Sequence, residues 1–97
     1  MIKRQGDLLI VKVEKIPEDA QTQKSRILAE GEATGHMHEL DSGEVYEKDG
    51  TLYFKVAEGG NVTLKHPEHG PLQFDEGVYQ VIRQREYIPE GWRRVED

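Results

Sequence analysis

One segment decides the fold class of this chain of 97 residues: Val45-Tyr46-Glu47-Lys48-Asp49-Gly50-Thr51-Leu52-Tyr53-Phe54-Lys55-Val56. Aromatic and β-branched residues, which favour extended backbone, stand on both sides of Asp49-Gly50. An Asp-Gly pair in this setting is typical of a two-residue turn between antiparallel strands. The segment therefore predicts a β-hairpin.

Upstream of this hairpin, the sequence indicates further strands. Residues 7–16 and 26–30 have extended apolar patterns, and residues 36–40 lie just before the turn signal at 41–43. Between the first two runs, residues 17–25 are polar and show no periodicity, so we expect a loop there.

Downstream of the hairpin, turn signals recur at short intervals. They predict interruptions of the strands at Gly59-Gly60-Asn61, His69-Gly70-Pro71 and Asp75-Glu76-Gly77, before a last strand over residues 78–87. No apolar pattern of helical period extends beyond a turn or two. We therefore expect residues 1–97 to form a single all-β domain, an antiparallel barrel or sandwich of about seven or eight strands.

The composition excludes several classes of protein. A net charge of -6 argues against general binding of nucleic acid or of an anionic membrane, and no apolar run has membrane-spanning length. The absence of cysteine excludes disulfides and thiolate chemistry and fits the cytoplasm. Only 35% of the residues are hydrophobic, so the core is thin and a homo-oligomer that shares burial is expected.

Two histidines close together make the segment Gly31-Glu32-Ala33-Thr34-Gly35-His36-Met37-His38-Glu39 the most unusual part of the sequence. If the chain is extended from Gly35 onward, His36 and His38 project from the same face with Cα atoms about 6–7 Å apart. Both imidazoles can then reach one metal ion or one ligand. The same pattern also suits two half-exposed histidines that hydrogen-bond to neighbouring strands.

The other two of the four histidines are His66 and His69. Alternation places His66 on the face of Val62 and Leu64, which we expect to point inward, whereas His69 lies in the following turn. His66 is therefore the better candidate for a third ligand, although turn stabilisation is the alternative for both residues.

The segment His36-Met37-His38, followed by Glu44 and Gly50, resembles the first metal-binding motif of the cupin family. In that family, two histidines and a later glutamate bind an ion inside a small β-barrel. The resemblance implies a divalent metal held by His36, His38 and Glu44, with His66 or His69 as a further ligand.

A closer resemblance covers most of the chain. It rests on residues 29–38, on Glu68-His69-Gly70-Pro71 and on residues 77–87, which are similar to segments of small uncharacterised proteins of bacteria and their phages. The resemblance implies a bacterial or phage setting and carries no biochemical activity with it.

The last predicted strand holds a second candidate site. Arg83, Arg85 and Tyr87 continue the face of Tyr79 and Val81, so two guanidinium groups extend an apolar stripe. Such a pair can bind a phosphate or a carboxylate. The alternative is that both arginines form salt bridges with the many carboxylates of this chain.

These observations favour a non-enzymatic module that binds a small anionic molecule, such as a nucleotide, or a partner protein. Its candidate ligand-binding residues are His36, His38, Arg83, Arg85 and Tyr87. One alternative is a cupin-like enzyme that depends on a divalent metal, with His36, His38, Glu44 and His66 as ligands. Another is a structural component of phage assembly, with the histidines at an interface.

Overall fold

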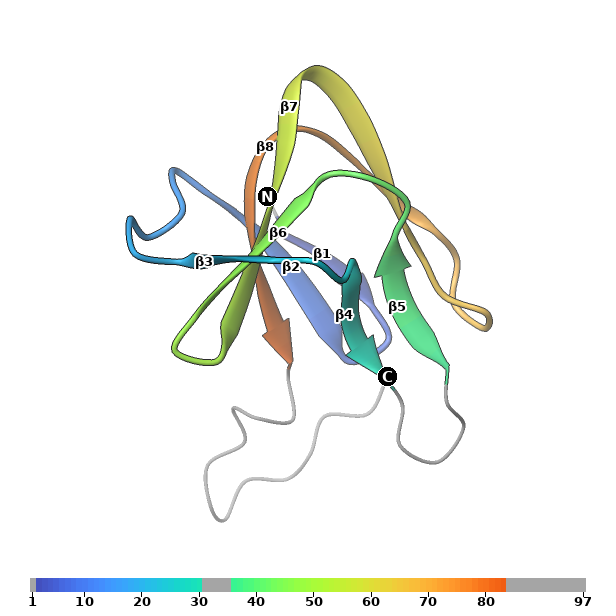
Figure 1. Ribbon diagram of the computed structural model, residues 1–97. Helices are drawn as coiled ribbons and strands as arrows, with labels where there is room; N and C mark the ends of the chain where they lie inside the picture. The colour runs from blue at the N-terminus through green and yellow to red at the C-terminus, as the bar shows by residue number, and fades with distance from the viewer. Residues whose placement is uncertain (1, 31–35, 84–97) are drawn as a thin grey trace.

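The computed structural model describes residues 2–30 and 36–83, which form eight strands and no helix (Figure 1). They are β1 (Ile2–Gln5), β2 (Leu8–Val13), β3 (Gln21–Gln23), β4 (Ile27–Glu30), β5 (Met37–Leu40), β6 (Glu44–Lys48), β7 (Thr51–Lys65) and β8 (Leu72–Arg83). All pairs are antiparallel, and the sheet curls into a half-barrel. The expected all-β class and the approximate number of strands are confirmed.

The sheet has a main path and a branch. Its main order is β1-β2-β8-β7-β5-β4, while β6 pairs with β7 and carries β3 on its other side. The predicted hairpin is present as β6 and β7, with Val45 opposite Phe54. Asp49 and Gly50 both have positive φ, 52° and 83°, as the tight turn requires.

The β7–β8 hairpin is long and bent, and it gives the molecule its shape. β7 has 15 residues and β8 has 12, but their register shifts between the pairs Val56–Gly77 and Asn61–Asp75. More residues lie between those pairs on β7 than on β8, so the ribbon bends, and Figure 1 shows it arching over at the top.

Two of the predicted chain reversals are therefore wrong. Gly59-Gly60-Asn61 and Asp75-Glu76-Gly77 do not end strands; they lie opposite each other at the bend. A carboxylate oxygen of Glu76 accepts a hydrogen bond from the backbone N–H of Gly59 at 3.0 Å. Glycines in both strands thus mark a bulge instead of two turns.

The expectation of a loop throughout residues 17–25 is also wrong in part. Gln21–Gln23 forms β3, which pairs with Val45–Glu47 of β6. The backbone hydrogen bonds of a strand edge can be satisfied by a polar segment, because they do not depend on apolar side chains.

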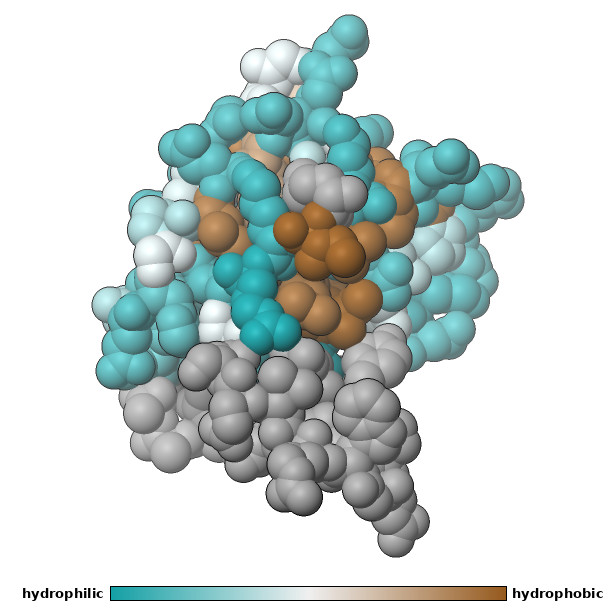
Figure 2. Space-filling view, turned by 180° about the vertical axis from the view of Figure 1, so that it is seen from behind, coloured by the Kyte–Doolittle hydropathy of each residue, from teal (hydrophilic) through white to brown (hydrophobic). Residues whose placement is uncertain are grey.

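Three aromatic rings from both halves of the bent hairpin form the centre of the core. Phe54 stacks on Tyr79 at 5.0 Å, and Phe74 meets these two rings at 5.3 and 5.0 Å. All three residues are fully buried. The bend therefore lets both halves of the hairpin contribute to one core. Figure 2 shows apolar side chains reaching the surface in a patch with hydrophilic ones on either side.

Side chains of β1 connect it to the far half of this hairpin. Lys3 Nζ donates to the carbonyl oxygen of Gln73, and Gln5 Nε2 donates to those of Leu64 and Gly70. This tie brings the β1–β2 turn against the segment between β7 and β8.

No helix in the described part of the chain is long and apolar enough to cross a membrane.

Candidate functional site

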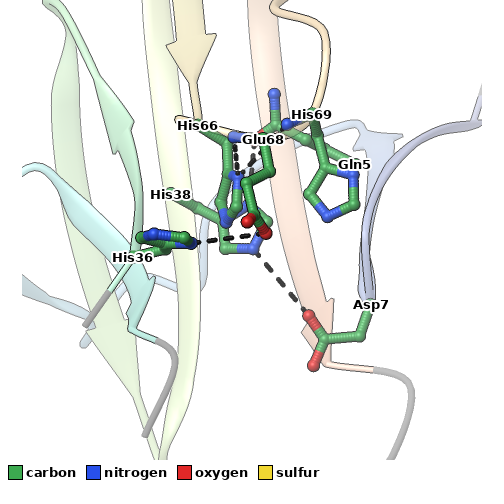
Figure 3. A network of polar contacts seen from close by, with 7 residues as sticks. All are labelled: Gln5, Asp7, His36, His38, His66, Glu68 and His69. Atoms are coloured by element: carbon green, nitrogen blue, oxygen red, sulfur yellow. Dashed lines mark hydrogen bonds and ion pairs between the residues drawn. The ribbon is translucent and has the colours of Figure 1, made fainter. Parts of the chain in front are cut away.

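All four histidines of the chain meet at one end of the sheet (Figure 3). His66 is at the centre, with its ring centroid 4.3 Å from that of His38, 4.6 Å from His69 and 5.7 Å from His36. His36 and His38 come from the start of β5, and the other two from the segment between β7 and β8. We call these rings, with Gln5, Asp7 and Glu68, the histidine end.

His38 is held by a buried hydrogen bond that also fixes its tautomer. Gln5 donates through Nε2 to two carbonyl oxygens, of Leu64 and Gly70, each at 2.9 Å. The remaining amide atom, Oε1, lies 2.8 Å from His38 Nδ1 and can only accept. Neutral His38 therefore carries its proton on Nδ1. Its Nε2 has no proton and can act as an acceptor through its lone pair.

His66 has the opposite arrangement. Its Nδ1 lies 3.0 Å from the backbone nitrogen of Glu68 and 3.3 Å from that of His69, and both N–H groups donate to it. Because Nδ1 accepts, neutral His66 carries its proton on Nε2. His66 stabilises the turn and offers a donor, whereas His38 offers an acceptor.

We therefore expect opposite tautomers for His38 and His66 near pH 7. Long-range ¹⁵N–¹H correlation spectra should show the Nδ1–H form for His38 and the Nε2–H form for His66, because each follows from a different neighbouring partner. The same tautomer in both residues would contradict the hydrogen-bond assignment.

The two central imidazoles are uncharged at neutral pH. Burial, together with neighbouring His66, lowers the pKa of His38 to about 4, against a smaller opposite effect of Asp7. Burial also lowers the pKa of His66, with contributions from His69 and His36. These two rings therefore add little positive charge at pH 7.

Two carboxylates face these rings. Glu68 Oε1 lies 3.4 Å from His36 Nδ1, and Asp7 Oδ1 lies 3.8 Å from His38 Nε2, as the dashed lines in Figure 3 show. The negative charge of two carboxylates at one site favours a cation or a hydrogen-bond donor over an anion.

The histidine end borders a hollow that is open to solvent, next to the short ladder between β5 and β7. Their ladder contains only the pairs Glu39–Lys65 and Leu40–Leu64. Beyond it lies an open hollow of about 350 Å³. It is lined by His36, Met37, Glu39, Lys65, His66 and Pro67.

Gly6, in the β1–β2 turn, allows the turn to lie directly on the rings. Its φ is +61°, and a Cβ there would be 2.9 Å from His69 Nε2 and 3.4 Å from His38 Cε1. Only glycine combines this backbone conformation with this close approach.

Replacing Gly6 by alanine should lower the free energy of unfolding by at least about 2 kcal/mol, from left-handed backbone strain plus the clash with His69. Gly50→Ala is the matched control, because its φ is +83° but a Cβ there meets nothing within 4 Å. Gly50→Ala should lower the free energy of unfolding, measured with urea, by only about 1 kcal/mol. Equal losses would show that the close approach has no energetic weight.

The cupin-like ligand set of His36, His38, Glu44 and His66 is not assembled in the structure. Glu44 begins β6 opposite Lys55, and its carboxylate accepts a hydrogen bond from the Tyr46 hydroxyl at 2.7 Å. The reason is the bend: β5 pairs with the second half of β7 and β6 with the first. Among residues 2–30 and 36–83, no three histidine, aspartate or glutamate side chains are placed so that they could hold a metal ion.

Arg83 ends β8 and continues the buried face of Tyr79 and Val81, as its alternation predicts. Its Nε is buried, with no hydrogen-bond partner in the part of the chain that the structure describes. Arg83 lines a separate hollow of about 140 Å³ together with Leu28, Gly50, Leu52 and Val81. Arg85 and Tyr87 lie outside the described residues.

Sequence reasoning missed three members of the histidine end: Gln5, Asp7 and Glu68. Gln5 follows Lys3 and Arg4 in a polar run, so nothing in the local pattern predicts that only 2% of its surface is exposed. The one available signal was Gly6, a turn residue immediately before the apolar run of β2.

Comparison with known proteins identifies the family. The family model described as "Domain of unknown function (DUF8820)" matches residues 4–84, and the chain therefore belongs to this family. The matched range includes every described member of the histidine end and Arg83. No curated protein and no solved structure matches the chain.

Proposed function

We propose that this protein is a small non-enzymatic binding module whose ligand docks at the histidine end. The observation that carries the proposal is the convergence of four imidazoles and two carboxylates, from three separate parts of the chain, beside an open hollow. Structural histidines need no such opening, whereas a ligand does.

A binding role is favoured over nucleophilic catalysis by the partners of the serines. Ser25 accepts a hydrogen bond from the Ile27 backbone, and Ser42 donates to Asp41. The chain has no cysteine. A hydroxyl or thiol activated by an adjacent histidine, which nucleophilic catalysis requires, is therefore not what these residues provide.

The charges at the histidine end argue for a different ligand from the anion that the sequence suggested. His38 is neutral at pH 7 and faces Asp7, and Glu68 lies beside His36. We propose that this ligand is a cation or a molecule that donates hydrogen bonds.

A ligand screen monitored by NMR tests the proposal. Protein without a histidine tag is titrated with zinc chloride, a polyamine, simple amines, nucleotides and small carboxylic acids, while the imidazole Hε1 signals of all four histidines are followed. We expect a cationic or donor probe to shift the His36 and His38 signals, and the response to weaken in His36→Ala. A screen in which no probe moves these signals would contradict the proposal.

An anionic ligand has one observation in its favour, at the separate hollow of Arg83. The buried Nε of Arg83 without a described partner is a donor that a carboxylate or phosphate would satisfy. If the nucleotides or acids of the screen bind there, Arg83→Lys should weaken them, because lysine lacks the planar donor fork. Unchanged binding in Arg83→Lys would remove this second candidate.

The remaining proposals concern assembly and setting: a cytoplasmic homo-oligomer in a bacterial or phage context. The thin core that the composition predicts and the apolar patch in Figure 2 support the homo-oligomer. The absence of cysteine supports the cytoplasm, and the bacterial or phage setting rests on the sequence resemblance alone. Light scattering at several concentrations measures the assembly. A defined oligomer that dissociates when His36 or Glu68 is changed, without any bound probe in the screen, would favour the structural alternative over the binding module.

A further inference from the structure

We propose that the ligand of the histidine end is a divalent transition-metal ion, bound by His38 Nε2 and the Asp7 carboxylate and enclosed by His36 and Glu68. This inference rests on the proposed function and names its ligand class. It replaces Glu44 and His66 of the cupin-like set with two carboxylates that the sequence did not indicate.

The hydrogen bond to Gln5 fixes the orientation of the His38 ring. A histidine that binds a metal through one nitrogen usually donates the other N–H to a carbonyl or carboxylate oxygen, which sets the tautomer and the ring orientation. Gln5 Oε1 does this for His38 Nδ1 at 2.8 Å, and Gln5 is itself held by two backbone carbonyls. The buried His38 ring is therefore preorganised with its Nε2 lone pair toward Asp7.

The spacing between the histidine nitrogens and the carboxylate oxygens is also close to that of two ligands on one metal ion. Ligand atoms of a tetrahedral ion with bonds of about 2.0–2.1 Å lie about 3.3–3.4 Å apart. His36 Nδ1 and Glu68 Oε1 are 3.4 Å apart, and His38 Nε2 and Asp7 Oδ1 are 3.8 Å apart. Imidazole with carboxylate is a donor set that suits zinc and neighbouring transition metals.

The two carboxylates are exposed to solvent, whereas the central imidazole is buried. The side chains of Glu68 and Asp7 are 65% and 40% exposed, whereas that of His38 is 6% exposed. No three of these groups converge on one point as they stand. Binding therefore draws Asp7, Glu68 and the half-exposed His36 onto an ion already fixed at His38.

His66 is not a ligand in this proposal. Its Nδ1 accepts two backbone N–H groups, so its Nε2 carries a proton and has no lone pair for a metal. The matched negative control is Glu44→Gln, because Glu44 accepts a hydrogen bond from Tyr46 on β6 and is not part of the histidine end. In His38→Asn, the amide nitrogen replaces Nδ1 as the donor to Gln5, and only the nitrogen that faces Asp7 is lost.

Isothermal titration of tag-free, chelator-treated protein with zinc chloride tests the inference. We expect one ion per chain in the unaltered protein and a loss of affinity of about 100-fold or more in His38→Asn. Asp7→Asn and Glu68→Gln should each weaken binding about 10-fold, and the control Glu44→Gln should stay within about 3-fold. Two-dimensional amide spectra of each variant show that its fold is retained.

Three results would overturn the inference: no zinc binding, binding unchanged in His38→Asn, or binding lost equally in Glu44→Gln and His38→Asn with both folds intact. Failure of this inference is distinguishable from failure of the binding module. If zinc gives no heat but a polyamine or amine shifts the His36 and His38 signals, the site stands and its ligand is not a metal. If no probe has an effect, both proposals fall.

Discussion

Replacing Gln5 by leucine should destabilise the protein by about 3–5 kcal/mol, a large part of the total stability of a small domain. Leucine fills a similar volume but leaves two buried groups, His38 Nδ1 and the carbonyl oxygen of Leu64, without their partner. Each buried polar group that loses its hydrogen bond costs about 1–3 kcal/mol. Urea unfolding measures the loss.

Gln73→Leu is the control for this substitution, because Gln73 is an exposed residue of β8. A surface change of this kind should alter the free energy of unfolding by less than about 0.5 kcal/mol. If both leucine variants had similar stability, the tie between β1 and the far half of the β7–β8 hairpin would have no energetic importance.

The second large effect is a loss of about 3 kcal/mol of stability as the pH falls from 6.5 to about 4 in the absence of metal. The pKa of His38 is about 4 in the folded state and 6.5 as a free side chain, so between these values only the unfolded chain binds the proton. Stability is therefore complete above pH 6.5 and falls progressively below it.

His38 does not titrate alone, and the experiment must separate it from its neighbours. His66, His69 and Arg83 oppose its protonation, and Asp7 favours it. The pKa of His66 is also lowered, so His66 adds a loss of the same sign. Comparing the pH dependence of urea unfolding in the unaltered protein with that of His38→Asn isolates the contribution of His38.

The free energy of unfolding of the unaltered protein should exceed that of His38→Asn by most at pH 7, and this excess should shrink toward pH 4. Exposed carboxyls such as Asp41, whose pKa is lowered by hydrogen bonds from the Thr63 backbone and Ser42, are present in both proteins. Their effect therefore cancels. Parallel stability curves between pH 4 and 7 would show that His38 is not held neutral by burial.

The fold class was predictable because its main signals are local. The Asp49-Gly50 turn and its flanking residues specify the β6–β7 hairpin without reference to the rest of the chain. The bend of the β7–β8 hairpin was not predictable in this way. Gly59 and Gly77 serve equally well in a turn or in a bulge, and only pairing between distant residues decides which one forms.

The candidate site was predictable to the same limited extent. Alternation alone put His36 and His38 on one face, and His66 meets both of them. Gln5 is 33 residues from His38 along the chain, and no sequence period connects the two. Glu44 was close in sequence to the histidines but was carried to the other half of the hairpin, since adjacent strands β5 and β6 pair with different halves of β7.

The bent hairpin also implies an order of folding. β7 and β8 are consecutive, so their ribbon can zip from the short segment that joins them at a small cost in loop entropy. The N-terminal strands arrive only after a much longer loop has closed, since Gln5 reaches Leu64 across 59 residues. We expect the contacts that Gln5 and Asp7 make with the rest of the histidine end to form last and, in hydrogen exchange, β1 to be the first strand to open.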